Sequence, residues 1–151
     1  MLVECVVYLA VFVILLGVAM GAFYFCWDDS KALMRTTDDI TAALRAGELW
    51  RADVRNASGA ISVETTASGE VVKIPEGKKE ILYKLNGGEV RRQASSDGPG
   101  QLLLPAVKSS EMKKDSRGSV TAWRWELALA QRTKGDHLPL LFTFEAAQKA
   151  P

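Results

Sequence analysis

The side chains that proteins use most often for catalysis and metal binding are scarce in this chain. It holds one histidine, His137, and two cysteines, Cys5 and Cys26. A zinc site commonly draws about four ligands from histidine and cysteine. A Ser–His–Asp site would have to use His137, and no nucleophile-elbow pattern is present. We therefore expect no catalytic activity, no cofactor and no metal, and we interpret His137 as an exposed turn residue.

Two other classes of site also lack support. Calcium prefers clustered carboxylates, but the loop residues Asp97, Asp115 and Asp136 have no spacing that predicts a site. A nucleic-acid-binding surface is usually strongly basic, whereas the formal net charge here is +1. The chain is therefore expected to bind no nucleic acid.

Charge is missing from a long N-terminal stretch. No charged side chain lies between Cys5 and Trp27, and as a helix this run would be roughly 34 Å long, which is enough for a bilayer core of about 30 Å. We predict a transmembrane helix over residues 1–27. Cys5 and Cys26 would then lie about 31 Å apart along the helix axis, which is too far for a disulfide.

Glu4 lies at the edge of the apolar stretch and has two interpretations. It could be a solvated carboxylate at headgroup level, or a charge that needs a partner in the membrane. A cleaved signal peptide is less consistent with the sequence, because no Lys or Arg precedes Lys31 and the apolar run is too long. The basic residues after the run, taken alone, would place the rest of the chain in the cytoplasm.

The helix is predicted to continue beyond the membrane to about residue 56. Apolar side chains recur with helical spacing and predict one face that packs on the rest of the domain. The residues expected to pack there are Leu33, Ile40, Leu44, Trp50 and Val54. Residues 28–58 would form this amphipathic half, and Gly59 would end the helix.

From residue 59 to 151 the sequence predicts an antiparallel β domain of six or seven strands. Alternation starts at Ile61–Thr66, continues at Glu70–Ile74, and Asn86-Gly87-Gly88 predicts a hairpin between Glu80–Leu85 and Glu89–Gln93. Leu102–Val107 is expected to be an edge strand because it contains Pro105. Ser109–Gly118 is expected to be a polar loop.

Val120–Ala130 is the clearest strand. Thr121, Trp123, Trp125, Leu127 and Leu129 fall on one face, and Arg124 and Glu126 fall on the other. The two tryptophans are expected in the core or on a sheet face. Leu138–Phe144 is the last predicted strand, and the tail after Glu145 is expected to fray. The predicted fold class is α+β, with one long helix packed on an antiparallel sheet.

An apolar helix with a glutamate at its start, continuing into a helix packed on an antiparallel sheet, resembles the type IV pilins and pseudopilins. Met1-Leu2-Val3-Glu4 is similar to the Thr-Leu-Ile/Val-Glu start of the mature family members. Residues 50–57, Trp-Arg-Ala-Asp-Val-Arg-Asn-Ala, resemble the end of the long helix in J-type minor pseudopilins of type II secretion systems and in related minor pilins. Residues 82–92 resemble their Tyr-Arg-Leu-x-Gly-Gly-x-Leu-x-Arg hairpin, and Trp125 and Leu138-Pro139 resemble their closing tryptophan and last strand.

The resemblance implies a structural subunit of a secretion or pilus-like filament, held in the inner membrane by a single pass with its C-terminal domain in the periplasm. Leu2, Val3 and Glu4 would be assembly residues, and Glu4 would pair with the N-terminal amine of a neighbour. The implied partners are other pilin-like subunits, the inner-membrane assembly platform, and a prepilin peptidase if a basic leader lies upstream. The alternative is a single-pass anchored β domain that binds a partner or ligand without forming filaments.

Overall fold

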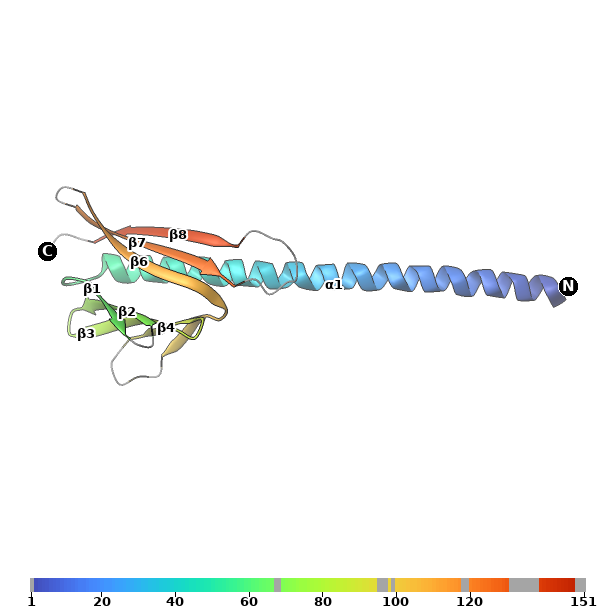
Figure 1. Ribbon diagram of the computed structural model, residues 1–151, viewed down its shortest axis with the longest axis horizontal. Helices are drawn as coiled ribbons and strands as arrows, with labels where there is room; N and C mark the ends of the chain where they lie inside the picture. The colour runs from blue at the N-terminus through green and yellow to red at the C-terminus, as the bar shows by residue number, and fades with distance from the viewer. Residues whose placement is uncertain are drawn as a thin grey trace. The chain divides into compact units, whose positions relative to one another are not determined.

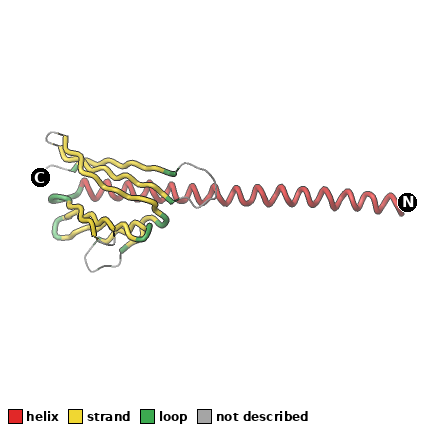
Figure 2. Tube along the Cα trace, viewed as in Figure 1, coloured by secondary structure: helices red, strands yellow, loops and turns green. Residues whose placement is uncertain are grey.

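One helix and eight strands are present among the residues that the computed structural model describes, which are 2–66, 69–94, 98, 100–117, 120–130 and 139–148. The helix α1 runs without a break from Leu2 to Arg55, as predicted. The chain divides into two compact units, Met1–Asp38 and Asp39–Pro151. The second unit holds the last turns of α1 and all of the strands (Figures 1 and 2).

The strands form two antiparallel sheets and not one. The larger sheet has the order β1-β2-β3-β4-β5 and the smaller has the order β6-β7-β8. The strand bounds are β1 Ser62–Thr66, β2 Gly69–Glu76, β3 Lys79–Asn86, β4 Glu89–Gln93, β5 Gln101–Leu104, β6 Val107–Arg117, β7 Val120–Leu129 and β8 Leu141–Ala147. The α+β class with a long helix packed against antiparallel sheets is confirmed.

The predicted hairpin joins β3 and β4. Asn86 pairs with Glu89, and the two residues between them, Gly87 and Gly88, have φ angles of 59° and 80°. Positive φ at both central residues matches the twist of a two-residue hairpin, and glycine reaches it without a steric penalty. The two turn glycines therefore set the register in which β3 pairs with β4.

Both sheets and the helix contribute to one hydrophobic core, and Trp125 lies at its centre. The Trp125 ring is fully buried. Its centroid lies 5.8 Å from that of Trp50 on α1, 6.2 Å from Tyr83 on β3 and 5.6 Å from Phe144 on β8. The expectation that the tryptophans of β7 belong to the core is confirmed, because Trp123 is also buried.

The prediction of which helix residues face the sheets was partly wrong. Trp50 and Val54 are buried as expected, and Ile40 is half-buried, but Leu33 and Leu44 are 69% and 50% exposed. Small residues take the buried positions instead: Ala43, Ala46 and Gly47. The Phe144 ring lies directly on Gly47, so the sheet approaches the helix where no side chain keeps it away.

The segment predicted as the loop Ser109–Gly118 is the longest strand, β6. It has no apolar alternation because it forms one edge of the smaller sheet, where Met112 is its one buried residue between Lys108 and Ser116. Backbone pairing with β7 and ion pairs hold it in place. Lys113 lies 2.9 Å from Glu111 and 3.8 Å from Glu126. Charged edge strands of this kind also discourage pairing with other chains.

The region around Pro105 is where the chain changes sheets. The single strand predicted over Leu102–Val107 is two strands, because β5 ends at Leu104 and β6 begins at Val107. Ala106 between them has a φ of 61°. The predicted edge position of the first strand is confirmed, since β5 is the last strand of the larger sheet.

The last strand also differs from its prediction. β8 begins at Leu141 and extends through Ala147, so the residues just after Glu145, which were expected to fray, still pair with β7. Ala146 is buried, and this burial explains why the strand continues past Glu145. Leu138 and His137 lie outside the described residues.

Replacement of Gly47 by alanine should lower the free energy of unfolding of the full chain by about 1–3 kcal/mol, the usual effect of overpacking. The added Cβ would overlap the Phe144 ring, and this outweighs the roughly 1 kcal/mol that alanine gains over glycine in a helix. Thermal unfolding in detergent, followed by near-UV circular dichroism, measures the change.

Gly21→Ala is the matched control on the same helix, because no described atom lies within 4 Å of its added Cβ. It should leave the unfolding temperature of the β domain unchanged. A Gly47→Ala protein as stable as the parent would mean that the helix is not held against Phe144.

Candidate functional site

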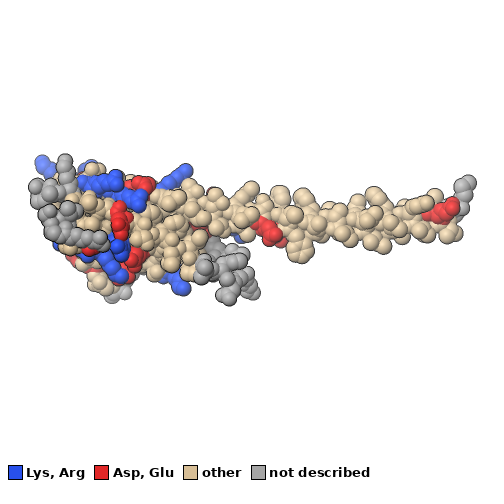
Figure 3. Space-filling model, turned by 90° about the horizontal axis from the view of Figure 1, so that it is seen from above, with Lys and Arg blue, Asp and Glu red and all other residues tan. Residues whose placement is uncertain are grey.

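The N-terminal part of α1 presents an uninterrupted apolar surface. Every residue from 3 to 31 is exposed, and none of the apolar window in this helix is buried. Figure 3 shows this surface almost free of charged residues, whereas both signs of charge gather on the β domain. A helix of this length and composition could span a membrane.

The three predicted assembly residues lie in the first turn of α1. Leu2 is the first helical residue, Val3 is 75% exposed, and Glu4 is the acidic residue of that turn. A carboxylate at this end is favoured by the helix dipole, because the first N–H groups of a helix carry partial positive charge.

Aromatic residues cluster at the opposite end of the apolar run. The rings of Phe23 and Trp27 stack with centroids 6.0 Å apart, and Tyr24 meets Phe23 edge-on at 6.4 Å. The Lys31 ammonium lies 5.3 Å from the centre of the Trp27 ring. Tryptophan and tyrosine are enriched at membrane–water interfaces, so this cluster has the composition of an interfacial end.

The second notable cluster is a buried ionic one that ties α1 to the larger sheet. The Asp53 carboxylate accepts a hydrogen bond of 2.5 Å from the Tyr83 hydroxyl. It also accepts two from the Arg92 guanidinium, at 2.8 and 3.0 Å. The side chains of Asp53 and Arg92 are 7% and 17% exposed. These partners compensate for the cost of burying the carboxylate.

Tyr83 and Arg92 keep their protons over the physiological range. Burial, together with the hydrogen bond to Asp53, raises the pKa of Tyr83 well above its usual value. The hydroxyl therefore stays protonated and donates a hydrogen bond to Asp53. The hydrogen bond to Asp53 likewise raises the pKa of Arg92. Groups that neither gain nor lose protons near neutral pH suit a structural role and not acid–base catalysis.

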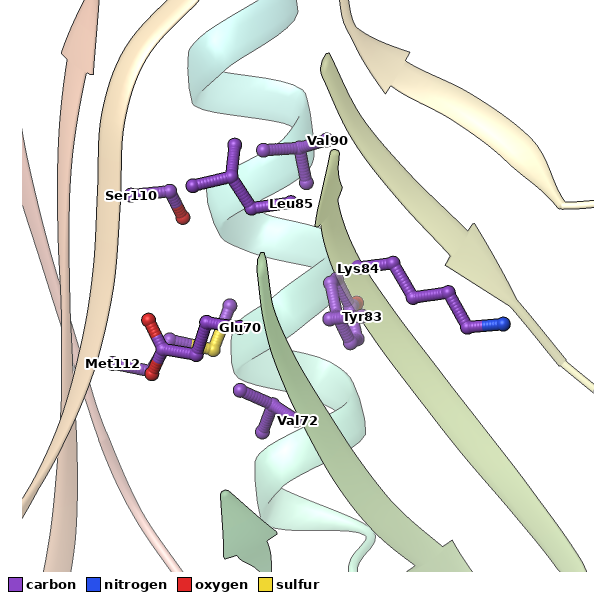
Figure 4. A pocket seen from close by; sticks show the side chains of 8 residues that line it. All are labelled: Glu70, Val72, Tyr83, Lys84, Leu85, Val90, Ser110 and Met112. Carbon is purple, nitrogen blue, oxygen red and sulfur yellow. The ribbon is translucent and has the colours of Figure 1, made fainter. Parts of the chain in front are cut away.

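A small gap opens between the larger sheet and β6. Figure 4 shows Glu70 and Met112 at one side of it, and Lys84 points away from it. The gap is lined mainly by Val72, Tyr83, Leu85, Val90, Ser110 and Met112, and it has room for about one water molecule. That is too little space for a substrate.

Glu70 is, with Tyr83, a titratable group of this gap whose pKa is raised by burial. Burial raises the pKa of its carboxyl above the usual value, and a hydrogen bond from the Met112 backbone N–H offsets part of the rise. The contact joins a side chain of β2 to the backbone of β6. Glu70 therefore links the two sheets at the cost of a partly desolvated charge.

The sequence predicted no metal site. Among the described residues, no three His, Cys, Asp or Glu side chains lie close enough to hold a metal ion. Of the acidic loop residues considered for calcium, Asp115 belongs to β6, and Asp97 and Asp136 lie outside the described residues. The expectation of no metal and no catalytic activity stays a prediction.

The ionic cluster was not predicted from the sequence. Asp53 falls on the same helix face as Trp50 and Val54, and an acid among buried apolar positions is a signal that a partner exists. Spacing could not identify that partner, because Tyr83 and Arg92 lie 30 and 39 positions away. The predicted packing residues Trp50 and Val54 lie beside the cluster on the same helix, and the predicted assembly residues belong to the other unit.

Comparisons with models of protein families, with curated proteins and with solved structures gave no match to this chain. Its function is therefore argued from its own residues.

Replacement of Asp53 by asparagine should lower the free energy of unfolding by about 3 kcal/mol, because it leaves the guanidinium of Arg92 buried without its counter-charge. The control is the exposed pair Glu89–Arg91, which lies on the same strand as Arg92. Glu89→Gln should lower the free energy of unfolding by less than about 1 kcal/mol. Equal losses for the two variants, measured by denaturant unfolding of the full chain, would contradict the importance of burial.

Replacement of Glu70 by glutamine should stabilise the protein at neutral pH. The folded-state pKa of Glu70 lies above its usual value of 4.5, so the folded state binds the proton more tightly than the unfolded state. The parent therefore gains stability as pH falls through the raised pKa, and glutamine mimics the protonated form. The difference in unfolding temperature should vanish below about pH 4. A glutamine variant less stable than the parent at pH 7 would refute this.

Proposed function

We propose that this chain is a structural subunit of a type II secretion or type IV pilus-like filament, of the minor pseudopilin kind, with no catalytic activity of its own. The observation that carries the proposal is the helix α1. Residues 5–27 of this helix are uncharged and exposed, and its last turns contribute to the hydrophobic core of an antiparallel β domain. A plain membrane anchor does not require that one continuous helix both crosses the membrane and packs inside the folded domain.

The positions of the resembling residues give independent support. The resemblance rests on separate stretches, and Asp53, Tyr83 and Arg92 come from two of them. These three side chains meet in the buried ionic cluster. Trp125, from a third stretch, contacts Tyr83. These contacts are compatible with a shared structural role for the resembling residues.

The proposed mechanism is assembly by helix packing. Subunits would wait in the inner membrane and then be moved into a filament in which their apolar helices pack against one another. Glu4 would pair with the N-terminal amine of a neighbouring subunit. Two opposite charges attract much more strongly in a low-dielectric environment than in water, and a charge left unpaired there is penalised. The pair would therefore set the axial register between helices.

The proposal also fixes location and partners. The helix would span the inner membrane once, with the β domain in the periplasm. The partners would be sibling pilin-like subunits and the inner-membrane assembly platform, and a prepilin peptidase would act if a leader lies upstream. The exposed faces of the β domain would contribute the surface by which siblings recognise one another.

Replacement of Glu4 by alanine should leave the protein in the membrane but abolish its co-purification with sibling subunits, because the register charge is lost. The measurement is co-purification from detergent-solubilised membranes in which the siblings are co-expressed. Asp28→Ala is the matched control, because it removes one acid at the other end of the apolar run. It should leave assembly intact.

A second variant separates the filament subunit from an anchored β domain. Shuffling residues 6–25 among apolar residues, with Glu4 retained, preserves hydrophobicity but destroys the packing surface of the helix. A filament subunit should lose co-purification, whereas a plain anchor should be unaffected. Unchanged co-purification for both this variant and Glu4→Ala would refute the proposal.

A further inference from the structure

The apolar helix carries aromatic residues at positions that match the two faces of a bilayer. Tyr8 and Trp27 are 19 positions apart, which is about 28 Å along a helix and close to the roughly 30 Å of a hydrocarbon core. Both are exposed, Tyr8 by 75% and Trp27 by 51%. The residues between them include no charge. This spacing indicates where each lipid interface would cross the helix.

Lys31 supplies a cation at one of these levels. Side chains on a helix tilt toward its N-terminus, so the Lys31 ammonium reaches back over the Trp27 ring, at 5.3 Å from its centre. Phe23, Trp27 and Lys31 repeat every four positions and share one helix face, and the Phe23 and Trp27 rings stack. The ammonium is therefore held about one turn closer to the apolar run than its own Cα.

We infer that Trp27 and Lys31 form a binding site for the phosphate of a phospholipid headgroup, in the leaflet nearer the β domain. The indole ring would lie at the boundary of the acyl chains, as interfacial tryptophans do. The ammonium keeps its remaining N–H donors for a phosphate oxygen. The Lys31 ammonium would favour a phosphate-bearing lipid, because a juxtamembrane lysine gains energy from anionic headgroups. Asp28 and Asp29 lie within one turn of it and would reduce this gain.

The same placement has a consequence for Glu4. It lies four positions before Tyr8, about 6 Å outside that interface, so its carboxylate would lie at headgroup level before assembly.

The lipid site at Trp27 and Lys31 rests on the membrane-spanning part of the proposed function and does not depend on filament formation. Its failure can therefore be separated from the failure of the proposed function.

The first experiment measures the depth of Trp27. The full chain is reconstituted in phosphatidylcholine vesicles that carry a nitroxide either on the headgroup or at the middle of the acyl chain. Trp50, Trp123 and Trp125 are at most 4% exposed, so the signal lost in Trp27→Phe isolates Trp27. We expect the headgroup nitroxide to quench Trp27 more strongly. Stronger quenching from mid-chain would overturn the inference while leaving membrane insertion intact. Failure to enter vesicles would overturn both.

The second experiment tests Lys31. Phosphatidylglycerol retained by the full chain on release from micelles is counted by native mass spectrometry. Lys31→Gln should retain about fivefold less lipid, the effect of one cation near a lipid surface. Arg35→Gln, one turn further along the helix and also exposed, is the matched control and should behave as the parent.

Free phosphate separates the two sources of the same chemistry. Added inorganic phosphate should not displace the lipid, because free phosphate has no acyl chains for the Trp27 ring to contact. Equal loss in Lys31→Gln and Arg35→Gln, unchanged retention in Lys31→Gln, or displacement by free phosphate would each overturn the inference.

Discussion

A buried carboxylate on the helix joins α1 to two neighbouring strands of the larger sheet. Asp53 receives hydrogen bonds from Tyr83 on β3 and Arg92 on β4, the two strands joined by the Gly87-Gly88 turn. The hairpin can therefore dock on α1 in one register only, since a shift by one residue would turn both donors to the other face. Tyr83 also contacts Trp125, which in turn contacts Trp50 and Phe144. The polar cluster and the aromatic core thus depend on the same register.

The helix was predictable where composition determines it and less so where packing does. An apolar run without charge, followed by good helix formers and no proline, predicted the helix to within a residue of its end at Arg55. Its contact face was only partly predictable, because large apolar side chains such as Leu33 and Leu44 dominate any periodicity. The sheet instead packs on Ala43, Ala46 and Gly47. Small residues carry little hydrophobic signal, although they allow the closest approach between a helix and a sheet.

Strands were predictable where one face is buried or a turn has special chemistry. β7 alternates strictly, and the glycine pair fixed the β3–β4 hairpin. β6 was missed because an edge strand needs little burial, so backbone pairing with β7 and ion pairs among Glu111, Lys113 and Glu126 hold it. The division into two sheets was missed for a similar reason. Pro105 was interpreted as a break within one strand, whereas the chain there passes from the larger sheet to the smaller one.

The helix joins two environments that make opposite demands on side chains. Over residues 3–31 it exposes large apolar groups, which only lipid or other apolar helices would cover. Over its last turns it buries small residues, tryptophan and a paired acid within protein. No proline and no paired glycines lie between Asp28 and Asp53, and these are usual causes of a sharp kink in a helix. The change of environment along α1 is therefore produced by the choice of side chains, because the backbone stays helical from Leu2 to Arg55.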